Sequence, residues 1–176
     1  MISKAEIKRH NIYYILDNQE EQLDSKYYKL VADVLYKFPY NVVNRLSVIS
    51  PQIFVIEKGS FADSFILKQM KMKSSRGTPI EEDEMFEKTW LILVNDELMD
   101  KCTLSEKHSI IAEELAHAYA GHNARKGDND DSSRVTDNYR EQEEEMEAAN
   151  LIKKWGFEPK DPVKILKRIN KKVSRI

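Results

Sequence analysis

Apolar residues recur with the period of an α-helix in several parts of the chain. Residues 25–37 show this pattern most clearly, and Pro39 follows where such a helix would end. Further along, Ser105 is suited to cap the start of a helix, and Gly121 is suited to end it. The pattern predicts helices over residues 25–37, 41–46, 105–119 and 136–155, and a short basic helix that begins near Pro162.

The middle of the chain has a different pattern, which is typical of β-strands. Residues 52–57 are rich in β-branched and aromatic side chains, residues 64–72 alternate less cleanly, and residues 89–94 form the strongest apolar run. We therefore expect an α+β fold with a small sheet of three to four strands in mostly sequential order. We also expect the strand at 89–94 to offer an edge to which an extended peptide could pair.

The composition excludes two classes of protein. Of the 176 residues, 41% are hydrophobic and 33% are charged, which is too apolar for a disordered chain and too charged for a membrane protein. The N-terminal residues lack the apolar core of a signal peptide. The single cysteine, Cys102, cannot form an internal disulfide and favours a reducing compartment. We therefore expect a cytoplasmic protein with no membrane partner.

The charges nearly cancel, but they are unevenly distributed. Lys and Arg number 28 against 30 Asp and Glu, so the net charge of -2 gives no general attraction to nucleic acid. Residues 137–147 hold six acids and one base, whereas residues 160–175 hold seven bases and one acid. A solvated helix face accounts for most of the acids, although such a density is costly unless a cation or a basic surface lies near.

The clearest candidate chemistry lies in residues 110–122, which read IIAEELAHAYAGH. Residues four apart share one face of a helix, so Glu113 lies beside His117, and Glu114 faces His117 from three residues away. This is the spacing of the H-E-x-x-H motif, in which two histidines bind zinc and the glutamate is the general base. Here Glu113 stands in the position of the first histidine.

A second, acidic helix is predicted about twenty residues after this motif, and the two helices together resemble gluzincin-type zinc metallopeptidases. In that family, a helix after the motif carries a glutamate ligand, often in a pattern like E-x-E-A-D. Residues 145–149 read E-M-E-A-A, which places Glu145 at the ligand position and Ala149 in place of the aspartate. The resemblance covers residues 30–157, with the most specific matches in the two helices.

The resemblance implies a zincin-like fold in residues 1–160, with the sheet packed against the motif helix and the second, ligand-bearing helix. The basic stretch 161–176 belongs either to the same domain or to an appendage. The resemblance also implies a zinc ion held by Glu113, His117 and Glu145, with Glu114 as the catalytic base and a protein or peptide as substrate.

Two departures from the family pattern leave alternatives open. With Glu113, the ligand set consists of two carboxylates and one imidazole. Such a set would weaken the metal as a Lewis acid, and it would also suit Mn²⁺ or Fe²⁺. Ala149 lacks the carboxylate that would orient a ligand. The alternative to a metal-dependent peptidase is an inactive zincin-like protein, with or without a metal, that acts as a binding or regulatory module.

Three further assignments follow from spacing. Glu144 competes with Glu145 for the position that faces the site. His122 lies five residues after His117, not the six of the H-E-x-x-H-x-x-G-x-x-H motif, so it is predicted to be a rim or structural residue. A di-iron bundle needs a second E-x-x-H motif, and the chain has only the one that ends at His117.

Overall fold

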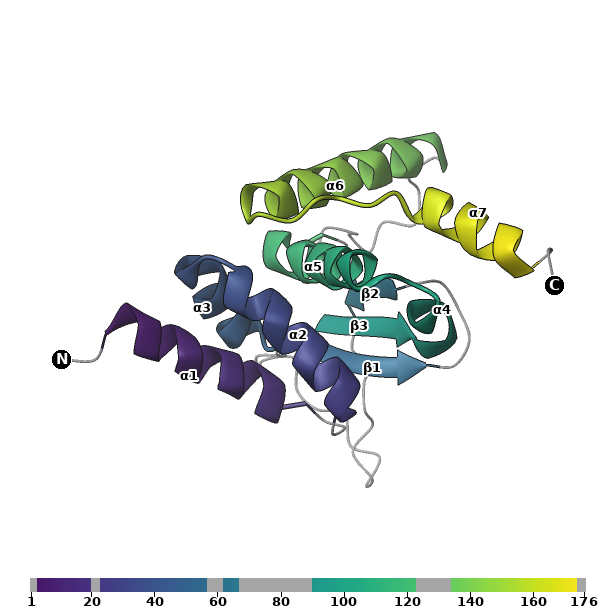
Figure 1. Cartoon of the computed structure of the whole chain (residues 1–176). Coiled ribbons are helices and arrows are strands. Elements are labelled where there is room, and N and C mark those ends of the chain that lie inside the picture. The colour runs from purple at the N-terminus through teal and green to yellow at the C-terminus, as the bar shows by residue number, and fades with distance from the viewer. Residues whose placement is uncertain (1–2, 20–22, 57–61, 67–89, 123–133, 174–176) are drawn as a thin grey trace, which may run out of the picture.

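The computed structural model describes residues 3–19, 23–56, 62–66, 90–122 and 134–173. Three helices come first, then three strands, and four further helices follow (Figure 1). In chain order the elements are α1 (Lys4–Asp17), α2 (Ser25–Lys37), α3 (Tyr40–Ile49), β1 (Gln52–Ile56), β2 (Ala62–Ile66), β3 (Trp90–Asn95), α4 (Asp96–Asp100), α5 (Leu104–Ala120), α6 (Arg134–Lys154) and α7 (Pro162–Val173).

The three described strands form one mixed sheet in the order β1-β3-β2. β1 runs parallel to β3, and β2 runs antiparallel to it. The α+β class is therefore confirmed, but the strands do not pair in sequential order. The prediction that the strand at 89–94 lies at an edge is wrong, because β3 pairs on both sides. Its alternate residues Trp90, Ile92 and Val94 are buried, which suits a central strand.

The predicted strand at 64–72 overlaps β2, whose described residues are Ala62–Ile66. Residues 67–72 lie outside the described residues, as does the first residue of the predicted strand at 89–94.

The elements are stacked so that α5 lies between the sheet and α6 (Figure 1). α5 contacts β2 and β3 on one side, α2 and α3 beside it, and α6 on the other side. The expectation that the sheet packs against the motif helix holds. The second helix, however, makes its main contacts with α5 rather than with the sheet.

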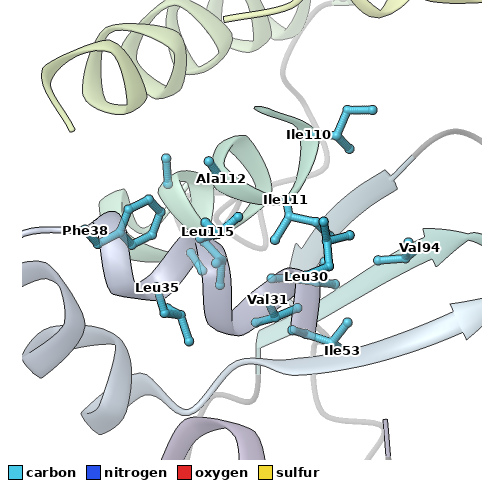
Figure 2. Close-up of a cluster of buried hydrophobic side chains, with 14 of the residues drawn as sticks. Leu30, Val31, Leu35, Phe38, Ile53, Val94, Ile110, Ile111, Ala112 and Leu115 are labelled. Carbon is cyan, nitrogen blue, oxygen red and sulfur yellow. The ribbon is translucent and has the colours of Figure 1, made fainter. Parts of the chain in front are cut away.

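The core forms where α2, α5 and the sheet meet (Figure 2). The apolar face of α2 lies against Ile111 and Leu115 of α5 and Ile53 of β1 (Figure 2). Each of these three partners is at most 2% exposed. Each apolar residue that defines the helical pattern in α2 is buried, namely Tyr27, Leu30, Val31, Val34 and Leu35. This core holds α5 in place and with it the motif residues.

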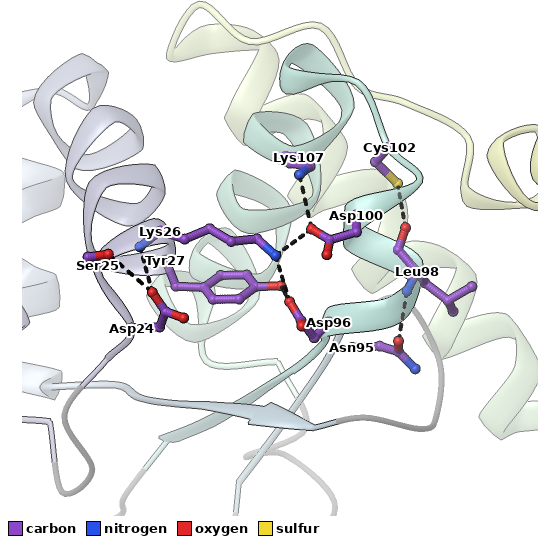
Figure 3. A network of polar contacts seen from close by, with 10 residues as sticks. All are labelled: Asp24, Ser25, Lys26, Tyr27, Asn95, Asp96, Leu98, Asp100, Cys102 and Lys107. Atoms are coloured by element: carbon purple, nitrogen blue, oxygen red, sulfur yellow. Dashed lines mark hydrogen bonds and ion pairs between the residues drawn. The ribbon is translucent and has the colours of Figure 1, made fainter.

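A polar network joins the start of α2 to α4 (Figure 3). The Tyr27 hydroxyl donates to Asp96 Oδ1 at 2.7 Å, and Lys26 Nζ donates to the same oxygen at 2.8 Å. Lys26 also pairs with Asp100, which lies 3.7 Å from Lys107 Nζ of α5. Burial and the Asp96 carboxylate both raise the pKa of Tyr27 well above its usual range, so this hydroxyl remains a donor.

The N-terminus of α5 is set by Thr103 rather than by Ser105. The Thr103 side chain accepts from the Glu106 backbone N–H at 3.3 Å, and the Glu106 carboxylate accepts from the Thr103 N–H at 2.7 Å, which forms a capping box. Arg168 of α7 donates to the same carboxylate at 2.7 Å. Together with the buried Ile165 and Ile169, this contact attaches the predicted basic helix to the rest of the fold.

Within the described ranges, no helix combines the length and the apolar character that crossing a bilayer requires.

Candidate functional site

The candidate site lies where α5 and α6 pack together. α5 carries Glu113, Glu114 and His117, and the two glutamates are partly buried while His117 is 6% exposed. On α6, the buried residues Glu144, Ala148 and Ile152 are spaced four apart and so form one buried face of the helix.

Glu145 follows Glu144 by one residue and so lies at the border of this buried stripe. Its side chain is 65% exposed but reaches α5. Glu144 is 7% exposed and is the more buried of the two candidates.

The structure brings His117 and Glu145 together. His117 Nε2 lies 3.7 Å from Glu145 Oε1, an ion-pair distance that is longer than a hydrogen bond. Burial disfavours the charged imidazole, but the contact with Glu145 and the charges of Glu114 and Glu113 outweigh it and raise the pKa of His117. The same contact lowers the pKa of Glu145. Because Glu145 is largely exposed, water screens this pair, and its contribution to stability is small.

Glu113 lies in a different electrostatic environment from Glu145. Burial raises the pKa of the Glu113 carboxyl to about 7, and the neighbouring Glu145 charge adds to the rise while His117 opposes it. A carboxyl with such a pKa gains from a nearby cation, which would favour its ionised form. The charges of Glu113, His117 and Glu145 thus influence one another, although the three side chains come from two different helices.

The structure adds His122 to this group. Gly121 has φ 77°, a left-handed conformation that ends α5 and turns the chain back. The His122 backbone N–H then donates to the His117 carbonyl at 3.1 Å, and the Gly121 N–H donates to the Ala118 carbonyl at 3.3 Å. These two bonds form a Schellman motif, which places the side chain at 122 beside the one at 117.

The side chain of His122 is fully buried and contacts both α5 and α6. Its Nδ1 lies 2.8 Å from His117 Nδ1, and its Nε2 lies 3.2 Å from Glu147 Oε2. A continuous row of side chains therefore runs from Glu147 through His122 and His117 to Glu145. Of the two alternatives predicted for His122, the rim is wrong, because the left-handed turn at Gly121 directs its ring inward, and the buried ring with two polar contacts fits the structural one.

Sequence reasoning missed Glu147 and the role of His122, although a signal for the histidine was present. When a left-handed glycine ends a helix, the residue after the glycine pairs with the residue four positions before the glycine. The pattern H-A-Y-A-G-H at residues 117–122 therefore indicates a contact between its two histidines. Glu147 carries no comparable signal, because its contact depends on how α6 lies against α5.

The donor chemistry of these residues fits a divalent metal. Two ligands that each lie about 2.0–2.2 Å from one ion are themselves roughly 3–4 Å apart. The 3.7 Å between His117 Nε2 and Glu145 Oε1 matches this separation. Within the part of the chain that the structure describes, no three His, Cys, Asp or Glu side chains are grouped to hold an ion as they stand. A full set would therefore need side chains to rearrange, with Glu113 as the candidate for the third ligand.

Comparisons of the chain with protein-family models, with curated proteins and with solved structures gave no match. Function is therefore proposed from the site and from the motif that its residues form.

Proposed function

We propose that the protein is a metal-dependent peptidase whose site is formed by α5 and α6. The observation that carries the proposal is the contact of His117 with Glu145, two side chains from different helices, with Glu113 close enough to be affected by both charges. The spacing of Glu113, Glu114 and His117 on α5 is that of a zincin motif with a carboxylate in the first position. A zincin-like fold is part of this proposal.

Glu113, His117 and Glu145 would hold the metal, with Zn²⁺ as the ion that the resemblance implies and Mn²⁺ or Fe²⁺ as alternatives. A bound divalent ion would polarise the scissile carbonyl and make a water molecule more acidic. Glu114 lies one residue from Glu113 on the motif helix and close enough to His117 for its charge to act on the imidazole. In the proposed reaction, Glu114 accepts a proton from the attacking water and delivers it to the leaving amine.

The sheet supports a peptide as substrate through β2 rather than β3. Among the described strands, β2 pairs only with β3 and lies at an end of the strand order. β2 also packs against α5, the helix that carries the motif. An extended peptide that pairs with this edge would therefore lie next to the motif helix.

The test compares metal content and peptide cleavage in the wild type and in Glu114→Gln. We expect the wild type to bind one divalent ion and to cleave members of a mixed peptide library, with products identified by mass spectrometry. Glu114→Gln should keep the metal and lose about 10²- to 10⁴-fold in rate, since it keeps the shape but not the base. Glu143→Gln, an exposed change on α6, is the matched control and should cleave normally. Full activity of Glu114→Gln would contradict the assigned role.

A second candidate is an inactive zincin-like module that binds a partner. It is favoured by Glu113 in the first ligand position and by the finding that no three-residue metal group is assembled among the described residues. A folded wild type that binds no Zn²⁺, Mn²⁺ or Fe²⁺ would support this candidate. In that case, a gain of metal affinity in Glu113→His would show that the rest of the site keeps a zincin geometry.

A further inference from the structure

His122 has the properties of a residue that orients another histidine. It is the only histidine in the described structure with no exposed area, and both of its ring nitrogens have polar neighbours. A buried imidazole nitrogen that faced only apolar atoms would cost free energy. Here Nδ1 faces His117 and Nε2 faces Glu147, so both polar atoms are satisfied.

The positions of the protons in this row follow from the contacts. The two Nδ1 atoms lie 2.8 Å apart, so a hydrogen bond between them needs one proton, because two would clash and none would leave two lone pairs face to face. The Nε2 atom of His122 faces a Glu147 carboxylate oxygen, which accepts but does not donate when ionised. Nε2 of His122 is therefore the protonated nitrogen, and a neutral His122 accepts at Nδ1.

We propose that His122 and Glu147 are positioning residues for His117. Glu147 accepts from His122 Nε2–H, and His122 Nδ1 accepts from His117 Nδ1–H. When His117 is charged, its Nε2–H faces the Glu145 carboxylate. When His117 gives up that proton, the bond to His122 keeps the proton on Nδ1, and the lone pair is left on Nε2. The consequence for metal binding rests on the proposed function, since the oriented lone pair is the one that a divalent ion would need.

The backbone supports the same arrangement. The Schellman motif at Gly121 fixes the main chain of His122 against the carbonyl of His117 at 3.1 Å. The two rings meet edge to face, with centroids 4.9 Å apart and planes at 72°. His117 and His122 lie five residues apart on a segment that the Schellman bonds close. The end of α5 therefore holds the two rings together, and α6 contributes Glu147 as the partner of His122.

The first measurement is the ¹⁵N NMR spectrum of the histidine rings in the metal-free protein at about pH 9, where an ordinary histidine is neutral. We expect His117 to carry its proton on Nδ1 and His122 to carry its proton on Nε2. In His122→Leu, the signals of His117 should shift toward a mixture of tautomers. His122→Asn offers an amide oxygen near the former Nδ1 position and should restore the Nδ1–H form of His117.

The second measurement is the affinity for Zn²⁺ by calorimetry, with Glu147→Ala as a variant that leaves the core intact because the side chain is 53% exposed. His122→Leu and Glu147→Ala should each weaken binding about 10- to 100-fold, the range for loss of a group that orients a metal ligand. His122→Asn should stay within a few-fold of the wild type. Glu143→Ala removes a neighbouring exposed acid of α6 and should have no effect.

The two measurements separate the failure of this inference from the failure of the proposed function. Unchanged His117 ring signals in both His122→Leu and Glu147→Ala would overturn the positioning role. The expected changes in the ring signals, in a protein that binds none of the three ions, would support the hydrogen-bonded row and reject the metal site.

Discussion

The helices α5 and α6 end in the same backbone motif but place different side chains in it. At the end of α6, Gly156 has φ 89°, and the Phe157 N–H donates to the Ile152 carbonyl at 2.9 Å. At the end of α5, Gly121 has φ 77°, and the His122 N–H donates to the His117 carbonyl at 3.1 Å. In both cases the glycine relieves the strain of a left-handed residue and turns the chain onto its own helix.

The paired side chains give the two ends different roles. Ile152 and Phe157 are buried and apolar, and the Phe157 ring meets the Phe38 ring edge to face with centroids 5.6 Å apart. This pair therefore anchors α6 to the core. His117 and His122 are also buried, but each has a polar contact on α6. The same local motif thus supplies either an anchor or a polar site, depending on the two residues that it brings together.

The largest effect should come from the apolar end. Phe157→Ala removes a buried ring and should lower the free energy of unfolding by about 3–5 kcal/mol, measured by urea denaturation. Val48→Ala, at a side chain that is 82% exposed, is the control and should change it little. If the two variants lost equal stability, the anchoring role of Phe157 would be wrong.

At the end of α5, a second substitution should recover the unfolding free energy that the first one loses. His122→Leu leaves the buried Nδ1–H of His117 without an acceptor and should cost about 1–3 kcal/mol of unfolding free energy. The double variant with His117→Leu removes both polar partners and should recover most of that loss, because apolar residues can fill the same space. A denaturation series on both single variants and the double variant measures the coupling. Additive losses would show that the two rings do not depend on each other.

The two glycines should behave alike in stability and differently at the site. A Cβ added at either one would meet no atom within 4 Å, so alanine there costs only the left-handed backbone, about 1–2 kcal/mol. Thermal or urea unfolding of Gly121→Ala and Gly156→Ala should therefore give similar losses. The ¹⁵N signals of His117 should change only in Gly121→Ala. A shift of these signals in Gly156→Ala as well would mean that the ring depends on the α6 end too.

The smallest effect concerns pH and the metal-free protein. The pKa of Glu113 in the folded protein, about 7, lies above the usual glutamate value of 4.5, so the folded state binds this proton more tightly. The stabilisation is complete below the unfolded pKa and is lost as the pH rises through about 7. The raised pKa of His117 acts in the same direction. Stability should thus fall from about pH 5 to pH 8, and less steeply in Glu113→Gln than in the control Glu143→Gln. Equal slopes in the two variants would contradict the burial of Glu113.

The helices were predictable wherever the apolar face was wide. α2 has five buried residues at helical spacing, and its observed bounds are those of the predicted range 25–37. α1 was not predicted, because only Ile12, Ile15 and Leu16 of its residues are buried and the pattern is correspondingly weak. The strands were recognisable from composition, but their order was not, since pairing joins segments far apart in the chain.

Part of the candidate site was also predictable, because it depends on contacts between near neighbours in the chain. The placement of Glu113, Glu114 and His117 on one side of α5 needs only the helical repeat. Glu145 was reached through the resemblance, and the structure places it beside His117. The contact between His122 and His117 is also local, but it depends on recognising that Gly121 adopts a left-handed conformation.

The sequence by itself determined the helices with wide apolar faces, the three segments that form strands and the spacing of the motif residues along α5, because these depend on contacts between near neighbours in the chain. Only the tertiary structure decided that β3 is the central strand, that α6 packs on α5, and that Glu145 and Glu147 reach the two histidines. It also decided that the pKa of Glu113 is raised, since burial is set by everything that packs around a side chain. These features depend on segments that are distant in the chain, and their packing is decided by the fold as a whole.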